Sequence, residues 1–138
     1  MQLKLKCILL VDDDKIANLM NKIVIDEADC SQSVVKKESA LAALKYLLEC
    51  SYNDQLPFPD IVFLDIQMPQ LSGWDFMIHY NDLKEKLKGV PIIYLLSVLA
   101  GQEEKLKAAD TPGLAGIYEK PLTQYTIDAI LNKHFLAD

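Results

Sequence analysis

Two apolar runs in this sequence end in carboxylates. The first, Ile8–Val11, is followed by three aspartates, Asp12 to Asp14, and the second, Ile61–Leu64, is followed by Asp65. If both runs are strands of one sheet, their aspartates lie together at one edge. Carboxylates that share a site repel one another unless a hard divalent cation lies between them. The arrangement suits phosphoryl transfer to an aspartate, in which the carboxylate is the nucleophile and an acyl phosphate forms.

The same chemistry needs a metal ion, a second cation and a hydroxyl group around the phosphoryl oxygens. Asp12 and Asp13, completed by Asp65, could supply carboxylate ligands for Mg²⁺. Lys120 could bring a fixed positive charge to the phosphoryl group. Ser97 could form a hydrogen bond at the phosphorylated oxygen. Each of these residues ends or closely follows a predicted strand.

Strands and helices alternate along the whole chain. Short apolar runs predict strands at 5–11, 33–37, 61–65, 92–97 and 114–118, and helical periodicity predicts helices at 15–28, 39–49, 73–87, 102–109 and 122–135. The alternation predicts an α/β fold, a single doubly wound (βα)5 domain over residues 1–138, with a parallel sheet between helices and right-handed crossovers. In such sheets a ligand binds beyond the carboxyl ends of the strands, which is where the candidate residues lie.

Within the predicted helices, apolar stripes and charge clusters suggest which sides are buried. Asp14 is the expected N-cap of the first helix, which carries Ile16, Leu19, Met20, Ile23 and Val24 on one side. In the second helix, Leu41, Leu44, Leu47 and Leu48 are predicted to face the core. Trp74 is expected to pack against the helix that it begins. The charged clusters 84–88 and 103–107 are interpreted as solvated helix faces.

Composition excludes several functional classes. The 138-residue chain has a net charge of −6, and all its basic residues are lysines. Nucleic-acid recognition favours arginine and a basic face, so we expect no nucleic-acid partner. No apolar run approaches the roughly 20 residues needed to span a bilayer, and the segment before Asp12 is too short for a signal-peptide core. These features predict a cytoplasmic protein without a membrane partner. The three cysteines lack metal-binding spacing and are expected to be reduced thiols.

Taken together and in order, these motifs resemble the receiver domain of two-component response regulators, the CheY-like superfamily. The resemblance extends from Ile8 to about Phe135. It rests on four segments, which are Leu10-Val11-Asp12-Asp13-Asp14, Leu64-Asp65-Ile66-Gln67-Met68-Pro69 with Gly73 after it, Leu96-Ser97, and Lys120-Pro121. It implies a flavodoxin-like fold whose five parallel strands have the order 2-1-3-4-5.

The resemblance also implies a role for each site residue. Asp65 would be the phosphoacceptor, and Asp12, Asp13, Asp65 and the backbone carbonyl of Gln67 would hold Mg²⁺. Ser97 would be the switch hydroxyl and Lys120 the phosphoryl-binding lysine, and the peptide bond before Pro121 is commonly cis in the family. The donor would be a histidine kinase or a phosphotransfer protein, and a downstream protein would recognise the phosphorylated form. No enzymatic activity is expected beyond self-phosphorylation and self-dephosphorylation.

The chain ends shortly after the last predicted helix, which predicts a stand-alone receiver of residues 1–138 without an output domain. Two residues depart from the family pattern. Ile117 stands where the family usually has tyrosine or phenylalanine, while strand alternation directs the neighbouring Tyr118 to the other face. Val98 is bulkier than the usual alanine or glycine. Both departures favour an alternative, a pseudo-receiver that is a phosphorylation-independent interaction module, whereas the intact acidic and lysine set argues against it.

Two other functional classes fit the sequence less well. Asp12-Asp-Asp14 satisfies the Asp-x-Asp motif of haloacid dehalogenase phosphatases. The chain has no room for the cap of those enzymes, however, and Asp65 in its Met-Pro context would be unexplained. A nucleotide-binding switch is disfavoured because no phosphate-binding loop of the G-x-x-x-x-G-K-[ST] type follows any strand.

Overall fold

The computed structural model describes residues 4–136, which form one parallel sheet with helices on both faces. The strands are β1 (Ile8–Val11), β2 (Val34–Lys37), β3 (Ile61–Asp65), β4 (Ile92–Ser97) and β5 (Gly116–Glu119). The helices are α1 (Lys15–Ala28), α2 (Ala40–Tyr52), α3 (Gly73–Leu83), α4 (Gln102–Ala109) and α5 (Gln124–His134), with a 3-10 turn, η1 (Lys84–Lys86), after α3. The strand order is β2-β1-β3-β4-β5, and every pairing is parallel. The predicted order 2-1-3-4-5 is confirmed.

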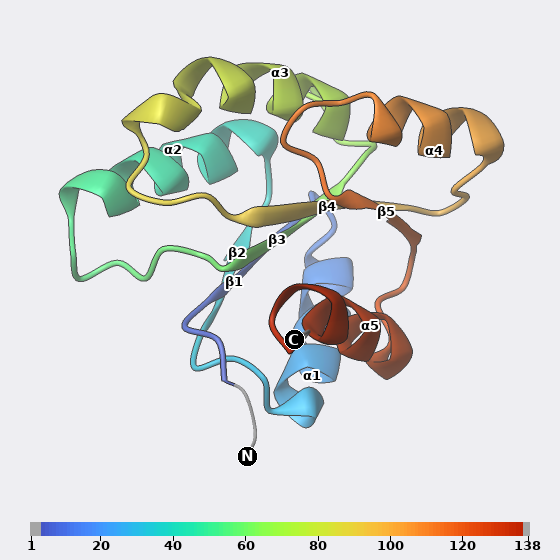
Figure 1. Ribbon diagram of the computed structural model, residues 1–138, viewed down its shortest axis with the longest axis horizontal. Helices are drawn as coiled ribbons and strands as arrows, with labels where there is room; N and C mark the ends of the chain where they lie inside the picture. The colour runs from blue at the N-terminus through green and yellow to red at the C-terminus, as the bar shows by residue number, and fades with distance from the viewer. Residues whose placement is uncertain (1–3, 137–138) are drawn as a thin grey trace.

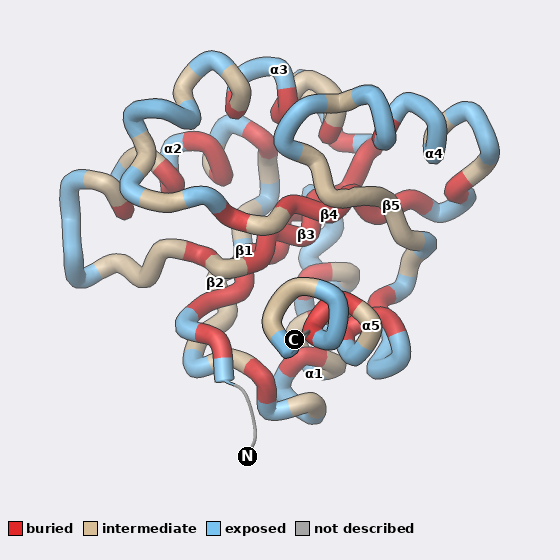
Figure 2. The backbone as a smooth tube through the Cα atoms, in the orientation of Figure 1, coloured by how far each residue is buried: buried red, intermediate tan, exposed pale blue. Residues whose placement is uncertain are grey.

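The sheet separates two helical layers. Helices α1 and α5 cover one face, and α2, α3 and α4 cover the other (Figure 1). Alternate residues of β1 supply both layers, because Leu9 and Val11 pack towards α2 and α3 while Ile8 and Leu10 pack towards α1 and α5. The central strands are buried throughout, as Figure 2 shows. Burial of each such leucine or isoleucine stabilises the fold by roughly 1.5–3 kcal/mol.

Most element boundaries agree with the sequence analysis, and four elements, α1, β3, β4 and α4, agree at both ends. The largest difference is at the end of α3, which stops at Leu83 and continues as a 3-10 turn instead of reaching residue 87. Strand β1 begins at Ile8, because Leu5 forms only an isolated bridge to Ser31. Helix α5 begins after Thr123, whose hydroxyl accepts a hydrogen bond from the Thr126 N–H.

The apolar side of α1 faces solvent. The exposed fractions of Ile16, Leu19, Met20 and Ile23 are between 44% and 69%. Two asparagines are buried on the opposite side. Asn18 donates hydrogen bonds to the carbonyls of Asp12 and Lys37, and Asn21 accepts one from the Leu122 N–H. The helix is therefore held to the sheet partly by polar contacts to loop backbone.

The apolar stripe of α2 is only partly buried. Leu44 and Leu47 lie in the core as predicted, and Leu48 is half-buried. The prediction for Leu41 was wrong, because 64% of this residue is exposed. Ala40, Ala43 and Leu44 around it are buried, so Leu41 lies at the outer side of the stripe and not on the face that packs.

The three cysteines are free thiols in the interior. Cys7, Cys30 and Cys50 are all buried. Cys50 packs in the layer of α2 and α3, and Cys30 packs in the layer of α1 and α5. Burial raises the pKa of the Cys7 thiol to about 11, so this side chain is protonated at neutral pH. None of the helices within residues 4–136 is both long and apolar enough to cross a bilayer.

Candidate functional site

Three carboxylates meet at the carboxyl ends of β1 and β3. The two strands are paired so that Val11 lies opposite Leu64, which places Asp12 beside Asp65. Asp12, Asp13 and Asp65 each offer an oxygen, and these oxygens lie within 4.8 Å of one another. Asp12 and Asp65 are buried, with 3% and 7% exposure, and Asp13 is exposed. The sequence prediction that these aspartates come together is confirmed.

Lys120 lies between the two buried carboxylates. Its Nζ is 2.7 Å from Asp12 Oδ2 and 3.4 Å from Asp65 Oδ1. The backbone N–H of Lys120, just past β5, donates a hydrogen bond to the Ser97 carbonyl, and the Lys120–Pro121 peptide bond is cis, as expected. Burial alone would lower the pKa of Lys120, but the contacts with Asp12 and Asp65 outweigh it and raise that pKa. The lysine is therefore a permanent cation in the site.

The lysine does not fully compensate the negative charge at Asp65. Burial raises the pKa of the Asp65 carboxyl, and repulsion from Asp12 raises it further. Lys120 and a hydrogen bond from the backbone of Gln67 act in the opposite direction without cancelling the increase. A site of this kind gains stability from a second cation. Its side-chain donors are all carboxylate oxygens, which are the ligands that Mg²⁺ prefers, so these residues fit that ion.

The turn between β3 and α3 fixes the backbone of Asp65. The N–H of Gly73 donates to the Ile66 carbonyl at 2.8 Å. A Cβ at Gly73 would lie 2.9 Å from the Asp65 carbonyl oxygen and 2.9 Å from Leu95 Cδ2, which is too close for any other residue without a shift. Ser72 and Asp75 cap α3 reciprocally. The glycine that follows Met68-Pro69 is thus required by the close approach of α3 to the strand end.

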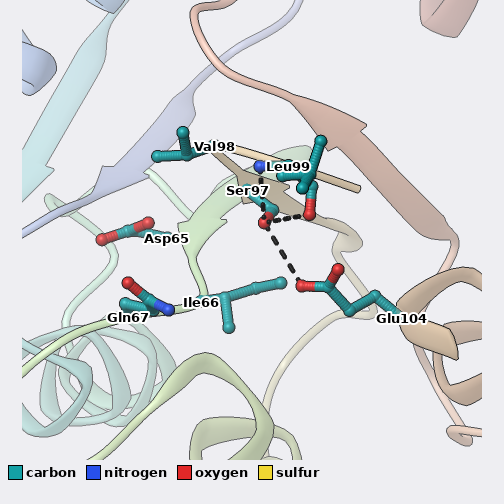
Figure 3. Close-up of a pocket in the computed structure, with 7 residues that line it drawn as sticks. All are labelled: Asp65, Ile66, Gln67, Ser97, Val98, Leu99 and Glu104. Atoms are coloured by element: carbon teal, nitrogen blue, oxygen red, sulfur yellow. Dashed lines mark hydrogen bonds between the residues drawn. The ribbon is translucent and has the colours of Figure 1, made fainter. Parts of the chain in front are cut away.

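Ser97 and Asp65 line a cavity of about 270 Å³ on the other side of the phosphoacceptor candidate (Figure 3). The Ser97 hydroxyl is 3.1 Å from the Leu99 carbonyl oxygen and 3.4 Å from Glu104 Oε2, which are its two possible acceptors. Gln67 lines the same cavity, and Val98 and Leu99 are exposed at its edge. Ser97 therefore faces the same space as Asp65.

Glu104 is the site residue that sequence reasoning missed. It lies in the cluster 103–107, which we interpreted as a solvated face, yet it is half-buried and its Oε1 accepts a hydrogen bond from the Gly101 N–H at 3.0 Å. The interpretation was also incomplete for Lys107, whose Nζ lies 4.4 Å from the centre of the Trp74 ring. The spacing Gly101-x-x-Glu104 is the capping-box spacing, and it was the available signal.

The departure at Ile117 is visible in the packing of β5. Ile117 packs on the side of α2 and α3, while Tyr118 packs on the opposite side, as strand alternation predicted. The Tyr118 ring lies 5.3 Å from the ring of Tyr94. No aromatic ring of β5 therefore faces the side on which Ile117 packs, where the resemblance led us to expect tyrosine or phenylalanine.

The profile of the response regulator receiver domain matches residues 8–132. The chain belongs to this family. This receiver domain is 32% identical over 127 residues to the chemotaxis protein CheY of Halobacterium salinarum, covering 91% of the chain and 93% of that protein.

Solved structures agree with this assignment. A two-component response regulator from Cytophaga hutchinsonii is 28% identical and superposes with a TM-score of 0.86, covering 94% of this receiver domain and 96% of that chain. The receiver domain of the histidine kinase CKI1 from Arabidopsis thaliana, complexed with Mg²⁺ and BeF3⁻, is 24% identical with a TM-score of 0.76, covering 93% and 91%. The second likeness concerns the fold alone. The chain is thus a CheY-like receiver domain of two-component signalling.

Proposed function

We propose that this receiver domain acts in the cytoplasm as a phosphoacceptor, taking a phosphoryl group from a histidine kinase or phosphotransfer protein onto Asp65. The observation that carries the proposal is the position of Asp65. Its buried carboxylate lies at a strand end within reach of Asp12 and Asp13, 3.4 Å from the Lys120 ammonium, and it opens into the cavity lined by Ser97. A purely structural carboxylate would not need two further acidic groups beside it.

The transfer itself is a displacement at phosphorus. A carboxylate oxygen of Asp65 forms the new P–O bond as the P–N bond to the donor imidazole breaks, and the imidazole leaves with the electron pair. Hydrolysis by water later returns the carboxylate and inorganic phosphate. The chain would thus act only on its own phosphorylation state. Lys120 is already placed to bind a phosphoryl oxygen, because its ammonium contacts Asp65.

Asp12, Asp13, Asp65 and the backbone carbonyl of Gln67 are the groups that would hold Mg²⁺. When bound, the ion neutralises charge on the phosphoryl oxygens. The oxygen-only chemistry of the cluster supports this set, and a solved receiver of the same fold carries Mg²⁺ with BeF3⁻. Among the three aspartates Asp13 is the exposed one, so it can exchange solvent for the ion without unfolding.

The exposed side of α1 is where the donor protein would dock. This helix begins directly after the acidic cluster, and Asp14 caps it by accepting a hydrogen bond from the Ile16 N–H. Ile16, Leu19, Met20 and Ile23 form an apolar strip on its outer side. Contiguous exposed apolar side chains commonly mark protein-binding surfaces. A helical donor on this strip would hold its phosphohistidine close to Asp65.

The test of the acceptor is the intact mass after incubation with acetyl phosphate and Mg²⁺. We expect one labile phosphoryl adduct on the wild type and none on Asp65→Asn, which is near-isosteric and should stay folded. An equal adduct on that variant would remove Asp65 from the mechanism. A folded wild type that gains no adduct from acetyl phosphate or from a histidine-phosphorylated protein would favour the pseudo-receiver, which Ile117 also favours.

The donor surface can be tested separately from the acceptor. Leu19→Lys should slow transfer from a phosphorylated histidine phosphotransfer protein at least about tenfold, because a buried charge would oppose docking, while leaving the reaction with acetyl phosphate unchanged. Leu41→Lys is a matched control, since Leu41 is equally apolar and 64% exposed but belongs to α2. Equal rates for the two variants would place the docking surface elsewhere.

A further inference from the structure

Glu104 brings a second carboxylate into the cavity of Asp65. It is the third residue of α4, and Figure 3 shows the contact of one of its carboxylate oxygens with the Ser97 hydroxyl. Oε1 accepts the Gly101 N–H at 3.0 Å, and Oε2 lies 3.4 Å from the Ser97 hydroxyl. Among the described residues that line this cavity, Asp65 and Glu104 are the charged ones and both are acidic. Nothing in the cavity wall compensates the charge of Glu104.

Ser97 cannot satisfy Glu104 and a phosphoryl group at once. A serine hydroxyl has one proton to donate, and the structure directs it to the Leu99 carbonyl or to Glu104. Both distances exceed the 2.7–2.8 Å that is usual for O–H···O hydrogen bonds, so both interactions are weak. A phosphoryl oxygen on Asp65 is a stronger, charged acceptor and would take this proton.

The charge of Glu104 opposes phosphorylation in a second way. A phosphoryl group adds about −1.5 to −2 charge at neutral pH. Two negative groups that share a small cavity repel each other, and the effect at a partly solvated site corresponds to about a three- to tenfold change in an equilibrium constant. Glu104 is only half-buried, so it can turn outwards to solvent when that repulsion appears.

We propose that Glu104 is a positioning residue that opposes phosphorylation of Asp65 and transmits it to α4. In the unphosphorylated protein Glu104 shares the Ser97 hydroxyl with the Leu99 carbonyl and adds negative charge to the cavity. Phosphorylation draws the Ser97 hydroxyl to the phosphoryl group and displaces Glu104, which loosens the first turn of α4. The inference rests on the proposed function. The inference gives the Ser97 hydroxyl a partner, Glu104, in a protein that has isoleucine at position 117, where the family usually has tyrosine or phenylalanine.

The displacement would be visible at Trp74. Lys107, one turn after Glu104 on α4, lies over the Trp74 ring at 4.4 Å from its centre. Trp74 is the single tryptophan of the chain, so its fluorescence reports this contact without interference from other indoles. A shift of α4 changes the distance between the lysine and the ring and therefore the emission.

The experiment compares Glu104→Gln with Glu103→Gln in the acetyl phosphate assay with Mg²⁺. Glutamine at 104 can still accept the Gly101 N–H, so the variant removes the charge and retains the helix cap. Glu103 is a matched control, because it is the exposed neighbour in the same first turn. For Glu104→Gln we expect a rise of about three- to tenfold in the initial phosphorylation rate or in the steady-state ratio of phosphorylated to unphosphorylated protein. For Glu103→Gln the same quantity should stay within about twofold of the wild type.

Three outcomes of this assay would overturn the inference, and they differ in whether the proposed function is retained. If the wild type is phosphorylated at Asp65 and the two glutamine variants behave alike, the role of Glu104 is refuted and the proposed function is retained. If the folded wild type and both glutamine variants remain unmodified, or if Asp65→Asn is modified as much as the wild type, both proposals fail. An increase in Glu104→Ala without one in Glu104→Gln would also refute the inference, because it would reflect only the lost cap.

Transmission to α4 has its own readout. Phosphorylation of the wild type should change Trp74 emission and speed amide hydrogen exchange in the first turn of α4 by at least about threefold. In Glu104→Gln the neutral side chain keeps the cap at Gly101 and is not repelled by the phosphoryl group, so phosphorylation should change exchange in that turn little. A response of α4 that is the same size in both proteins would show that the signal does not pass through Glu104.

Discussion

The two sides of Asp65 are built from different kinds of contact. On the side of β1 and β5, Lys120 contacts the buried carboxylates of Asp12 and Asp65 at 2.7 and 3.4 Å, and the atoms involved are largely shielded from solvent. On the side of β4 and α4, the Ser97 hydroxyl makes neutral or long contacts, the cavity is open, and Val98 and Leu99 are exposed. One side is charged and closed, and the other is weakly held and accessible.

This difference separates two tasks within one site. The charged side provides groups that must already be in place when a phosphoryl group arrives, and rigid preorganisation favours that chemistry. The open side provides contacts that can be exchanged at little cost, which a conformational response requires. Substitutions should therefore alter stability strongly on the first side and alter the response, with little change in stability, on the second.

Loss of the central cation should have the largest effect on stability. Lys120→Ala leaves Asp12 and Asp65 adjacent and buried without a counter-charge, and removing one partner of a buried ion pair costs about 3 kcal/mol. Urea denaturation in metal-free buffer measures this change. Lys45→Ala, at an exposed position on α2, is the control and should change the free energy of unfolding by less than about 0.5 kcal/mol. Equal midpoints for the two variants would mean that the charged side contributes no more than a surface contact.

A methyl group at the strand end should have the next largest effect. Gly73→Ala places a Cβ 2.9 Å from the Asp65 carbonyl oxygen, so the backbone of Asp65 must shift. We expect a loss of about 2 kcal/mol in stability together with slower phosphorylation. Gly101→Ala is the control, since its Cβ would meet Glu104 Oε1 at an ordinary 3.5 Å. If Gly73→Ala were no more harmful than Gly101→Ala, close approach would not explain the glycine.

Removal of the charge on Asp65 should stabilise the metal-free protein. Because the pKa of Asp65 is raised above its ordinary 3.8, the folded protein holds this proton more tightly than the unfolded chain does. The stability of the wild type therefore falls as the pH rises from the ordinary pKa of an aspartate to the raised pKa of Asp65. Asp65→Asn cannot ionise and does not lose this stability. The variant should equal the wild type below pH 3.8 and be the more stable protein at neutral pH.

The pH series has a metal control. Added Mg²⁺ should stabilise the wild type at neutral pH and should affect Asp65→Asn less, because the variant lacks one carboxylate ligand. A stability difference that is constant from acid to neutral pH would contradict the raised pKa, since it would show that ionisation of Asp65 is not involved.

The smallest effect is expected on the open side. Ser97→Ala removes only long hydrogen bonds and should change stability by less than about 0.5 kcal/mol. Ser72→Ala is a useful comparison, because the Ser72 hydroxyl caps α3 and its loss costs about 1 kcal/mol. If Ser97→Ala proved the more destabilising, the open side would be held more firmly than its distances indicate, and the contrast between the two sides would fail.

The sequence was sufficient for the parts of the site that belong to strand ends. Asp12, Asp65, Ser97 and Lys120 could be placed because parallel strands bring their carboxyl ends to one edge, and that rule needs no knowledge of side-chain packing. The strand order 2-1-3-4-5 followed from the resemblance. Both predictions depend on backbone topology, which is the property that apolar periodicity encodes best.

Prediction failed where a side chain had two plausible environments. Ile16, Leu19, Met20 and Ile23 of α1 and Leu41 of α2 have the period of core positions but are exposed. In α1 the reason is that Asn18 and Asn21 anchor the opposite side of the helix to loop backbone, which sequence alone does not place. Glu104 reads as a surface glutamate among charged neighbours. Only the three-dimensional approach of α4 to the end of β4 brings it to Ser97.

Alkylation of the buried thiols would report when the interior of this protein opens to solvent. Only a thiolate reacts readily with alkylating reagents, and burial both shields Cys7 from a reagent and raises its pKa to about 11. Cys30 and Cys50 lie in opposite helical layers. The rate at which Cys30 is modified would therefore report the opening of the layer formed by α1 and α5. The rate at which Cys50 is modified would report the opening of the layer formed by α2 and α3. When both modification rates are measured in one sample, the opening rates of the two helical layers can be compared without an added probe.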